Sequence, residues 1–197
     1  MGTDWSRFGI HNIEESFPGI AGTFSGRCLL VAGGRCVWED LKETGYLSEP
    51  SGFHVMCIND VYMHFPGPVN HFYSNDARFS PRWLSARREL LVREFEGQAK
   101  LHTHSNMSGL QYKWPWPGHG TSSLSGAYTL LALGYDEIIL CGVPLDDSGH
   151  YFDPPWKKTN FSREVIEQEG GPRYWKNMLP LFDGKLKVMS GRLKELF

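Results

Sequence analysis

Short apolar runs alternate with amphipathic stretches along most of the chain. Runs such as CLLVA, HVMCI and EIILC are flanked by turn residues, as is typical of buried strands. Stretches such as SGAYTLLALGY have the apolar spacing of helices instead. Strands that alternate with helices predict an α/β fold. We therefore expect a Rossmann-like, doubly wound and mostly parallel sheet with flanking helices, in a single domain.

The predicted elements follow one another at short intervals. Strands are expected within residues 27–35, 53–60, 69–76, 99–106, 136–143 and 185–190. Helices are expected within residues 36–45, 81–97, 125–135 and 172–182. The Pro/Trp-rich stretch LQYKWPWPGHG at 110–120 is expected to be an irregular loop, because proline disrupts helices and sheets.

The chain divides into an N-terminal extension, residues 1–26, and a Rossmann-like nucleotide-binding domain, residues 27–197. The extension is polar, contains glycine and proline, and shows no clear period. We expect it to pack on the domain or on a neighbouring subunit. A length of 197 residues fits one domain.

Composition narrows the class of protein. The formal net charge is −2 and the pI is near 6.4, so nothing global predicts a nucleic-acid partner. No apolar run is long enough to span a membrane. The four cysteines form no CxxC pair, which favours free thiols and a reducing cytoplasm over zinc or disulfides.

Two groups of side chains allow more than one interpretation. The arginines of residues 78–93 are expected on the solvated face of an amphipathic helix, or as a phosphate- or partner-binding patch. The members named for this face are Arg78, Arg82, Arg87, Arg88 and Arg93. Trp114, Trp116 and Trp156 either stack on a base or sugar ring, or cap the core.

Polar or glycine residues terminate every predicted strand of the main sheet. In a parallel sheet these ends share one edge, and ligands of open α/β sheets bind there. Asparagine offers a donor and an acceptor, and glycine permits close backbone approach. The residues at these ends are Gly33 and Gly34, Asn59 and Asp60, Asn75 and Asp76, Ser105 and Asn106, and Gly142. Turn chemistry alone is the competing interpretation.

The helix that begins near Thr121 is a candidate anion site. The first N–H groups of a helix have no partner within it, and here they follow hydroxyl-bearing residues: Thr121, Ser122 and Ser123. The sequence therefore predicts a site for a phosphate-bearing ligand at the same sheet edge.

Three segments resemble a known group of Rossmann-like proteins. They are RCLLVAGGRCVWEDLKE, the pair VMCIND and HFYSND, and TSSLSGAYTLLALGYDEIILCGVPLDDSGHYFD, within residues 27–153. This arrangement resembles the bacterial sialyltransferases of the Campylobacter type and the archaeal hydroxymethylpterin pyrophosphokinases, the DUF115 group. The resemblance implies a nucleotide-binding domain that handles CMP-sialic acid in one branch and a nucleoside triphosphate in the other.

Carried over position by position, the resemblance implies a nucleotide site. Gly33 and Gly34 would lie near the phosphates or ribose, Asn59 and Asn75 would bind the nucleotide, and Gly142 would allow close approach. Thr121 and Ser122 would contact the nucleotide from the helix start, and Arg35 and Ser123 complete the candidate set. Residues 35–38 differ from the Gly-Pro-Ser-Leu found at this turn in the family. The family's general-base histidine lies further along the chain than His150, which is the last histidine of this sequence.

His150 is the best candidate for an acid/base group. It lies in the loop DDSGHYFD, and we expect Asp146 and Asp147 to orient its imidazole. These two carboxylates would alternatively hold Mg²⁺ that bridges phosphates. A polar surface loop without chemistry is the simpler interpretation. His102, His104 and His119 are a weaker candidate metal set.

These observations leave three hypotheses for function. The first is a glycosyltransferase-like enzyme that uses a CMP- or UDP-type sugar donor and a small-molecule or glycan acceptor. The second is a Mg²⁺-dependent pyrophosphokinase acting on ATP, and the third is a non-catalytic nucleotide-binding module. Because the chain is short for a two-lobed enzyme, self-association to complete the cleft is a further expectation.

Overall fold

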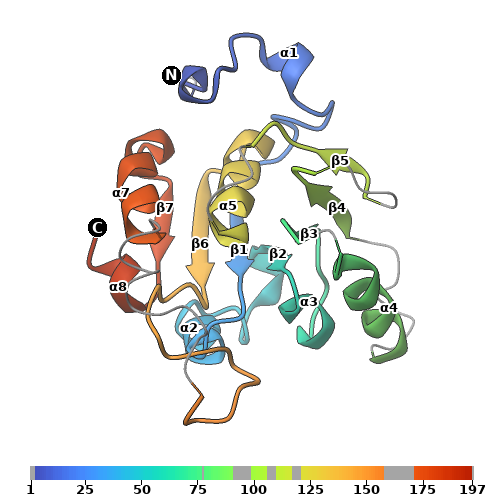
Figure 1. The fold of residues 1–197 in the computed structure, drawn as a ribbon, viewed down its shortest axis with the longest axis vertical. Coiled ribbons are helices and arrows are strands. Elements are labelled where there is room, and N and C mark those ends of the chain that lie inside the picture. Colours follow the sequence, from blue (N-terminus) through green and yellow to red (C-terminus); the bar gives the residue numbers. More distant parts are fainter. Residues whose placement is uncertain are drawn as a thin grey trace.

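Seven strands, all parallel, form one sheet in the computed structural model of the chain, in the order β5-β4-β3-β2-β1-β6-β7 (Figure 1). The structure describes residues 3–76, 78–90, 99–105, 110–116, 121–157 and 171–196, with backbone only at 88–90 and 171. The strands are β1 (Arg27–Val31), β2 (His54–Ile58), β3 (His71–Tyr73), β4 (Lys100–Thr103), β5 (Tyr112–Lys113), β6 (Glu137–Cys141) and β7 (Leu186–Val188). The expected Rossmann-like α/β sheet is confirmed.

Helices cover both faces of this sheet, as two separate groups of buried side chains show. One group packs α5 and α7 against one face, and the other packs α2 and α3 against the opposite face. Because β1 lies between these layers, its residues from Cys28 to Val31 are fully buried and apolar on both sides. The helical elements are η1 (Ser6–Phe8), α1 (Ile13–Ser16), α2 (Val37–Glu43), η2 (Pro50–Gly52), α3 (Val61–His64), α4 (Ser80–Leu90), α5 (Ser122–Leu133), α7 (Gly171–Phe182) and α8 (Gly191–Lys194).

The N-terminal extension packs on the domain, as one of the two expectations had it. Trp5 lies 5.3 Å from Trp116, and Phe17 lies 5.5 Å from Trp114, measured between ring centroids. The extension also follows the last turn of α5, because Gly22 N–H donates to the carbonyl of Ala132. Figure 1 shows this segment, with α1, at the end of the molecule opposite α2.

Trp114 and Trp116 belong to this core rather than to a ligand platform. Both are buried, and Trp116 donates its indole N–H to Thr129 Oγ1 at 2.8 Å.

The expectation that residues 110–120 contain no regular structure is wrong at β5. Tyr112 and Lys113 precede the first proline of the stretch, so their backbone remains free to pair with β4.

The expectation that Arg87 lies on a solvated helix face is also wrong. Its side chain is buried, and its guanidinium donates to the carbonyl oxygens of Tyr62 (2.6 Å), Phe65 (3.2 Å) and Gly67 (2.9 Å). The five-donor guanidinium thus satisfies the carbonyls at the end of α3, which fastens α4 to α3. Arg78 is exposed, in line with the solvated-face interpretation, whereas Arg93 and the side chain of Arg88 lie outside the described residues.

Three histidines and a tyrosine form one hydrogen-bonded chain across β2, β3 and β4. The Trp114 indole donates to His102 Nδ1 (3.0 Å), His102 Nε2 contacts His71 Nδ1 (3.0 Å), and Tyr135 Oη lies 2.8 Å from His71 Nε2 and 2.6 Å from His54 Nδ1. An indole can only donate, so every later bond has one direction: His102 donates to His71, His71 to Tyr135, and Tyr135 to His54. This arrangement requires neutral imidazoles.

Burial enforces the same state. It lowers the pKa of His71 well below its usual value and that of His102 to about 3. Protonation of either ring would place a charge inside the core and would leave one hydrogen bond without an acceptor.

The histidine chain predicts loss of stability in mild acid. In the unfolded chain these imidazoles take up protons below a pKa of 6.5, whereas the folded state resists protonation until about pH 3 at His102. The free energy of unfolding should therefore fall as pH drops from 7.5 to 5, by up to about 1.4 kcal/mol per pH unit for each buried histidine. Urea unfolding at several pH values measures this slope. The exposed-site variant His11→Asn should keep it, and a flat profile would contradict the neutral chain.

Candidate functional site

The strand order reverses between β1 and β6, and glycines follow both strands at this point. Gly34 N–H donates to the carbonyl of Gly142 at 2.9 Å. A methyl group at Gly34 would lie 2.5 Å from Pro144 Cδ, and one at Gly142 would overlap the carbonyl oxygen of Ala32. Gly142 also has a φ of 71°, which other residues rarely adopt. Contacts within the chain therefore account for both glycines without a ligand.

A buried carboxylate holds this junction in place. Asp40 of α2 accepts hydrogen bonds from Gly142 N–H (2.8 Å) and from the Ser190 hydroxyl (2.9 Å). The Ser190 hydroxyl also contacts Cys36 Sγ at 2.9 Å, and burial raises the pKa of that thiol to about 12. Asp40 thus connects the ends of β6 and β7 to the start of α2.

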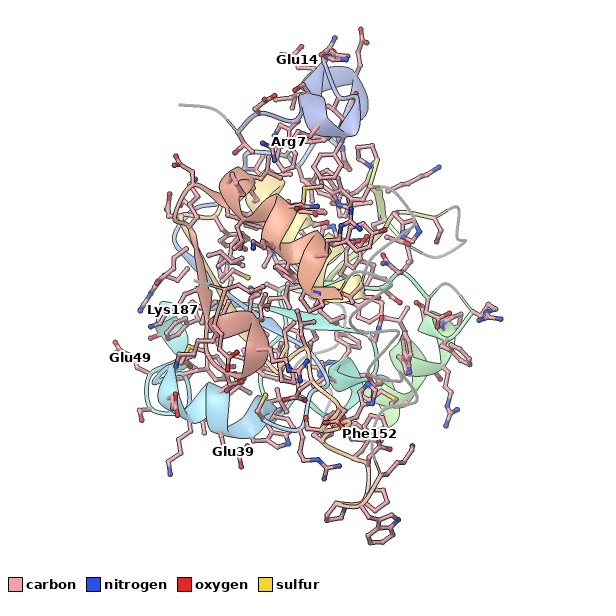
Figure 2. All side chains as sticks on the ribbon, turned by 60° about the vertical axis from the view of Figure 1, so that its left-hand side comes forward. Arg7, Glu14, Glu39, Glu49, Phe152 and Lys187 are labelled. Atoms are coloured by element: carbon pink, nitrogen blue, oxygen red, sulfur yellow. The ribbon has the colours of Figure 1, made fainter. Side chains whose placement is uncertain are left out.

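The loop after β6, residues 142–157, folds back across the turn after β1. The Arg35 N–H donates to the carbonyl of Gly149 at 3.1 Å, and Tyr151 N–H donates to the carbonyl of Gly33 at 3.0 Å. The Arg35 guanidinium lies under the same loop and donates to four of its carbonyl oxygens: those of Ser148 (2.7 Å), Asp153 (3.3 Å), Pro154 (3.1 Å) and Lys157 (3.3 Å). Arg35 therefore holds the loop in place. Figure 2 shows Phe152, a residue of this loop, at the end of the molecule opposite Glu14.

His150 is positioned by this loop at the edge of the sheet. Its Nδ1 lies 3.5 Å from Asp153 Oδ2, and its ring is stacked on Phe152 with centroids 5.2 Å apart. The Asp153 carboxylate is itself held by His150 N–H (3.2 Å) and by Lys157 Nζ (2.6 Å). The hydrogen bond from Lys157 is the main reason that the pKa of Asp153 is lowered, so Asp153 is an anion at neutral pH.

Within its own loop, the carboxylate beside His150 is thus Asp153, which sequence reasoning missed. Asp146 instead accepts a hydrogen bond from Ser148 N–H at 2.9 Å, as in a common aspartate turn, and Asp147 is exposed. The spacing His-x-x-Asp in HYFD was the available signal, because a tight turn brings such a pair together. Of the two ring nitrogens of His150, Nδ1 is the one that faces Asp153.

A second group of polar side chains joins the ends of β2 and β3 to the start of α5. Asn59 Nδ2 lies 3.3 Å from Ser122 Oγ, Asn75 N–H donates to the same oxygen at 3.3 Å, and Asn75 Nδ2 lies 3.4 Å from Ser125 Oγ. Thr121 caps α5 by accepting from Leu124 N–H at 3.2 Å. These predicted residues, from three separate segments, are in mutual contact.

Among the described residues, each of the two asparagines keeps one amide atom without a partner. Asn59 Oδ1 and Asn75 Oδ1 are buried, and no described residue donates a hydrogen bond to either. If either amide were turned around, its nitrogen would be left unpaired instead, since the serine hydroxyl can serve only one end. A φ of 55° at Asn59 is a second unfavourable feature at this position. Such costs at a sheet edge are typical of sites that a ligand completes.

The two groups meet at the end of β2. Asp60 follows Asn59 and lies beside His150, since a methyl group at Gly33 would lie 3.1 Å from His150 Cδ2 and 3.4 Å from Asp60 Oδ1. Ser123, another residue of the expected nucleotide site, contacts Thr121 Oγ1 through its Oγ at 2.8 Å. Burial lowers the pKa of His104, a member of the weaker metal set. His119 and Asn106 lie outside the described residues.

A metal centre is not formed by the residues that the structure describes. Within them, no three His, Cys, Asp or Glu side chains gather as a cation would require. His102, a member of the weaker metal hypothesis, is committed to His71 and Trp114. Nor does any helix in the described ranges have the length and apolar character needed to cross a membrane.

Comparisons of the chain with protein-family models, curated proteins and solved structures gave no match. The assignment of function therefore depends on the geometry of this edge and on the sequence motifs.

The four-carbonyl contact of Arg35 predicts that Arg35→Lys loosens the loop after β6. Lysine keeps the charge but cannot direct a planar fork at several carbonyls. Hydrogen exchange at the Tyr151 amide should accelerate by about tenfold, equivalent to about 1.4 kcal/mol of lost protection. Arg78→Lys, at an exposed arginine far from this loop in the sequence, should change nothing. Unaltered exchange in Arg35→Lys would show that the backbone bonds alone hold the loop.

Proposed function

We propose that this protein is a nucleotide-binding transferase of the glycosyltransferase type, with a CMP- or UDP-activated sugar as donor. Three features support the proposal: the polar carboxyl edge of the sheet, an oriented histidine at that edge, and the resemblance to the sialyltransferase-like group. The donor's nucleotide would lie across the ends of β2 and β3, and its phosphate near the start of α5.

The unpaired amide atoms of Asn59 and Asn75 carry the proposal. A buried polar atom without a hydrogen bond costs about 1–3 kcal/mol, so a ligand that supplies the missing partners gains affinity. Nucleotides supply such partners as base amino or imino groups and ribose hydroxyls. Two convergent amides from adjacent strands suit this planar, multiply bonded kind of ligand.

The start of α5 supports the position of the phosphate. The first N–H groups of a helix have no intrahelical acceptor, and at α5 Thr121 Oγ1 takes that of Leu124. The helix has twelve residues, so its dipole adds a favourable term for an anion.

His150 would act as the base in the transfer step. The acceptor hydroxyl gives its proton to His150 Nε2 while its oxygen attacks the anomeric carbon of the donor sugar. The bond from that carbon to the phosphate oxygen breaks, and the nucleotide leaves with the electron pair. Asp153 keeps the imidazole in the correct tautomer and stabilises the imidazolium.

Thermal-shift measurements with CMP, UDP, ATP and CMP- or UDP-sugars, each with and without Mg²⁺, test the proposal. Stabilisation by a pyrimidine nucleotide without Mg²⁺ is the expected result, because binding to the folded state raises the melting temperature. A shift that requires both ATP and Mg²⁺ would favour phosphoryl transfer instead. Binding without turnover that is unaffected by His150→Ala would favour a non-catalytic module, and no shift with any ligand would reject nucleotide binding.

The role assigned to Asn59 predicts that Asn59→Ala weakens nucleotide affinity by about 1–3 kcal/mol, through loss of a buried hydrogen bond. Titration calorimetry with the nucleotide that gives the largest thermal shift measures the change. Asn177→Ala, at an exposed position on α7, is the matched control and should bind like the unaltered protein. Equal affinity in both variants would remove Asn59 from the site.

A further inference from the structure

We propose that the buried imidazole of His71 is a pH-sensitive switch for the N-terminal extension: when it takes up a proton, residues 3–24 leave the domain while the sheet stays folded. The histidine chain lies at the amino ends of β2 and β3, since His54 and His71 are their first residues. The candidate nucleotide site lies at the opposite ends of these strands, so the inference does not depend on the proposed function. Three observations carry it: what covers His71, which protons its neighbours hold, and where the extension is attached.

The extension covers the histidine chain. The ring of Phe24 lies 4.9 Å from that of His71 and 5.5 Å from that of Tyr135, measured between centroids. Earlier in the extension, Phe17 packs against Trp114, the indole donor at the start of the chain. Departure of the extension therefore uncovers one side of the His71 ring.

Both nitrogens of the His71 ring are already committed. The Trp114 indole occupies His102 Nδ1, so the proton of neutral His102 lies on Nε2 and points at His71 Nδ1. His71 in turn donates from Nε2 to Tyr135 Oη. A proton added at His71 Nδ1 would face the N–H of His102 across 3.0 Å, with no lone pair between them. The packed arrangement therefore admits only the neutral ring.

The ionisable neighbours of His71 do not offset a charge on it. They are His54 of β2, Lys100 and His102 of β4, Tyr135 after α5, and Cys28 of β1 beside Tyr135. Burial is the main reason that the pKa of His71 is lowered, and repulsion from the two histidines and the lysine lowers it further. The tyrosine hydroxyl and the thiol stay neutral, because burial raises the pKa of both. Among the described residues that act on His71, none is a carboxylate.

The extension can leave without disrupting the sheet. The N–H groups of Gly22 and Phe24 donate to the last turn of α5, at 2.9 and 3.0 Å. Two residues later the chain is fixed again, because the carbonyl of Gly26 accepts from the N–H groups of Asp136 and Glu137 at the start of β6. Gly22 and Gly26 both have a positive φ, of 69° and 77°, and free space where a side chain would lie. These contacts separate a removable segment that ends at Phe24 from the strand that follows it.

Release is favoured as pH falls. In the packed state the pKa of His71 is well below 6.5, so the ring is neutral. In the released state the uncovered ring meets water, and its pKa returns toward 6.5. Because the released state then binds more protons, its population relative to the packed state rises by up to about tenfold per pH unit below this value.

Hydrogen exchange followed by mass spectrometry tests the proposal on the unaltered protein. Peptides from residues 3–24 are compared with peptides from β1 and β6 at about pH 7.5 and about pH 5.5, with labelling times corrected for the intrinsic effect of pH. Protection of the extension should fall by about tenfold between these pH values. A low concentration of urea should leave this protection unchanged, because release exposes far less surface than unfolding of the sheet.

Variants at His71 test whether this residue is the cause. Glutamine and asparagine offer a donor and an acceptor but do not titrate. His71→Gln and His71→Asn should therefore each reduce the pH-dependent loss of protection to less than about threefold. A purely structural role of His71 would instead lower protection by the same factor at both pH values and leave the pH-dependent loss intact. His11→Asn, at an exposed histidine of the extension, is the matched control and should keep the full loss.

The proposal is wrong if the extension of the unaltered protein keeps the same protection at both pH values. It is also wrong if that protection falls only together with β1 and β6 and responds to urea as they do, since the extension then leaves only on global unfolding. A full loss that persists in a folded His71 variant would assign the effect to another group. Circular dichroism melting shows which variants are folded, and the urea comparison on the unaltered protein decides if neither is.

Discussion

The close approach of β1 and β6 is the constraint on which the candidate site depends. Gly34 and Gly142 allow a backbone hydrogen bond where any side chain would collide, and Asp40 holds the Gly142 amide in place. With the junction closed in this way, the loop after β6 must cross the turn after β1. His150 therefore lies near Asp60 at the end of β2, although it follows a strand on the other side of β1.

The two glycines of the turn after β1 have different surroundings. Gly34 is required by packing within the chain, whereas Gly33 borders the side chains of Asp60 and His150. Arg35, the next residue, donates to four loop carbonyls, so its guanidinium holds the loop that carries His150. Asn59, Asp60 and Asn75, at the ends of β2 and β3, belong to the candidate site.

The sequence predicted the sheet well because each strand is short, apolar and bounded by turn residues. It also predicted that the strand ends would converge, since parallel strands require it, and Asn59, Asn75 and Ser122 are indeed in contact. It failed where the outcome depends on tertiary partners. The burial of Arg87 depends on carbonyls exposed at the end of α3, and the pairing of β5 depends on the free edge of β4. The choice of Asp153 over Asp146 depends on a turn whose shape no periodicity records.

The central claim is that the unpaired amides of Asn59 and Asn75 are completed by a bound nucleotide. The side-chain amide signals of asparagines in a ¹⁵N-correlated NMR spectrum, assigned by Asn59→Asp and Asn75→Asp, report on this directly. The account predicts that a pyrimidine nucleotide shifts both signals while that of Asn177, exposed on α7, stays in place. Nucleotide binding that leaves the Asn59 and Asn75 signals unmoved would contradict the account.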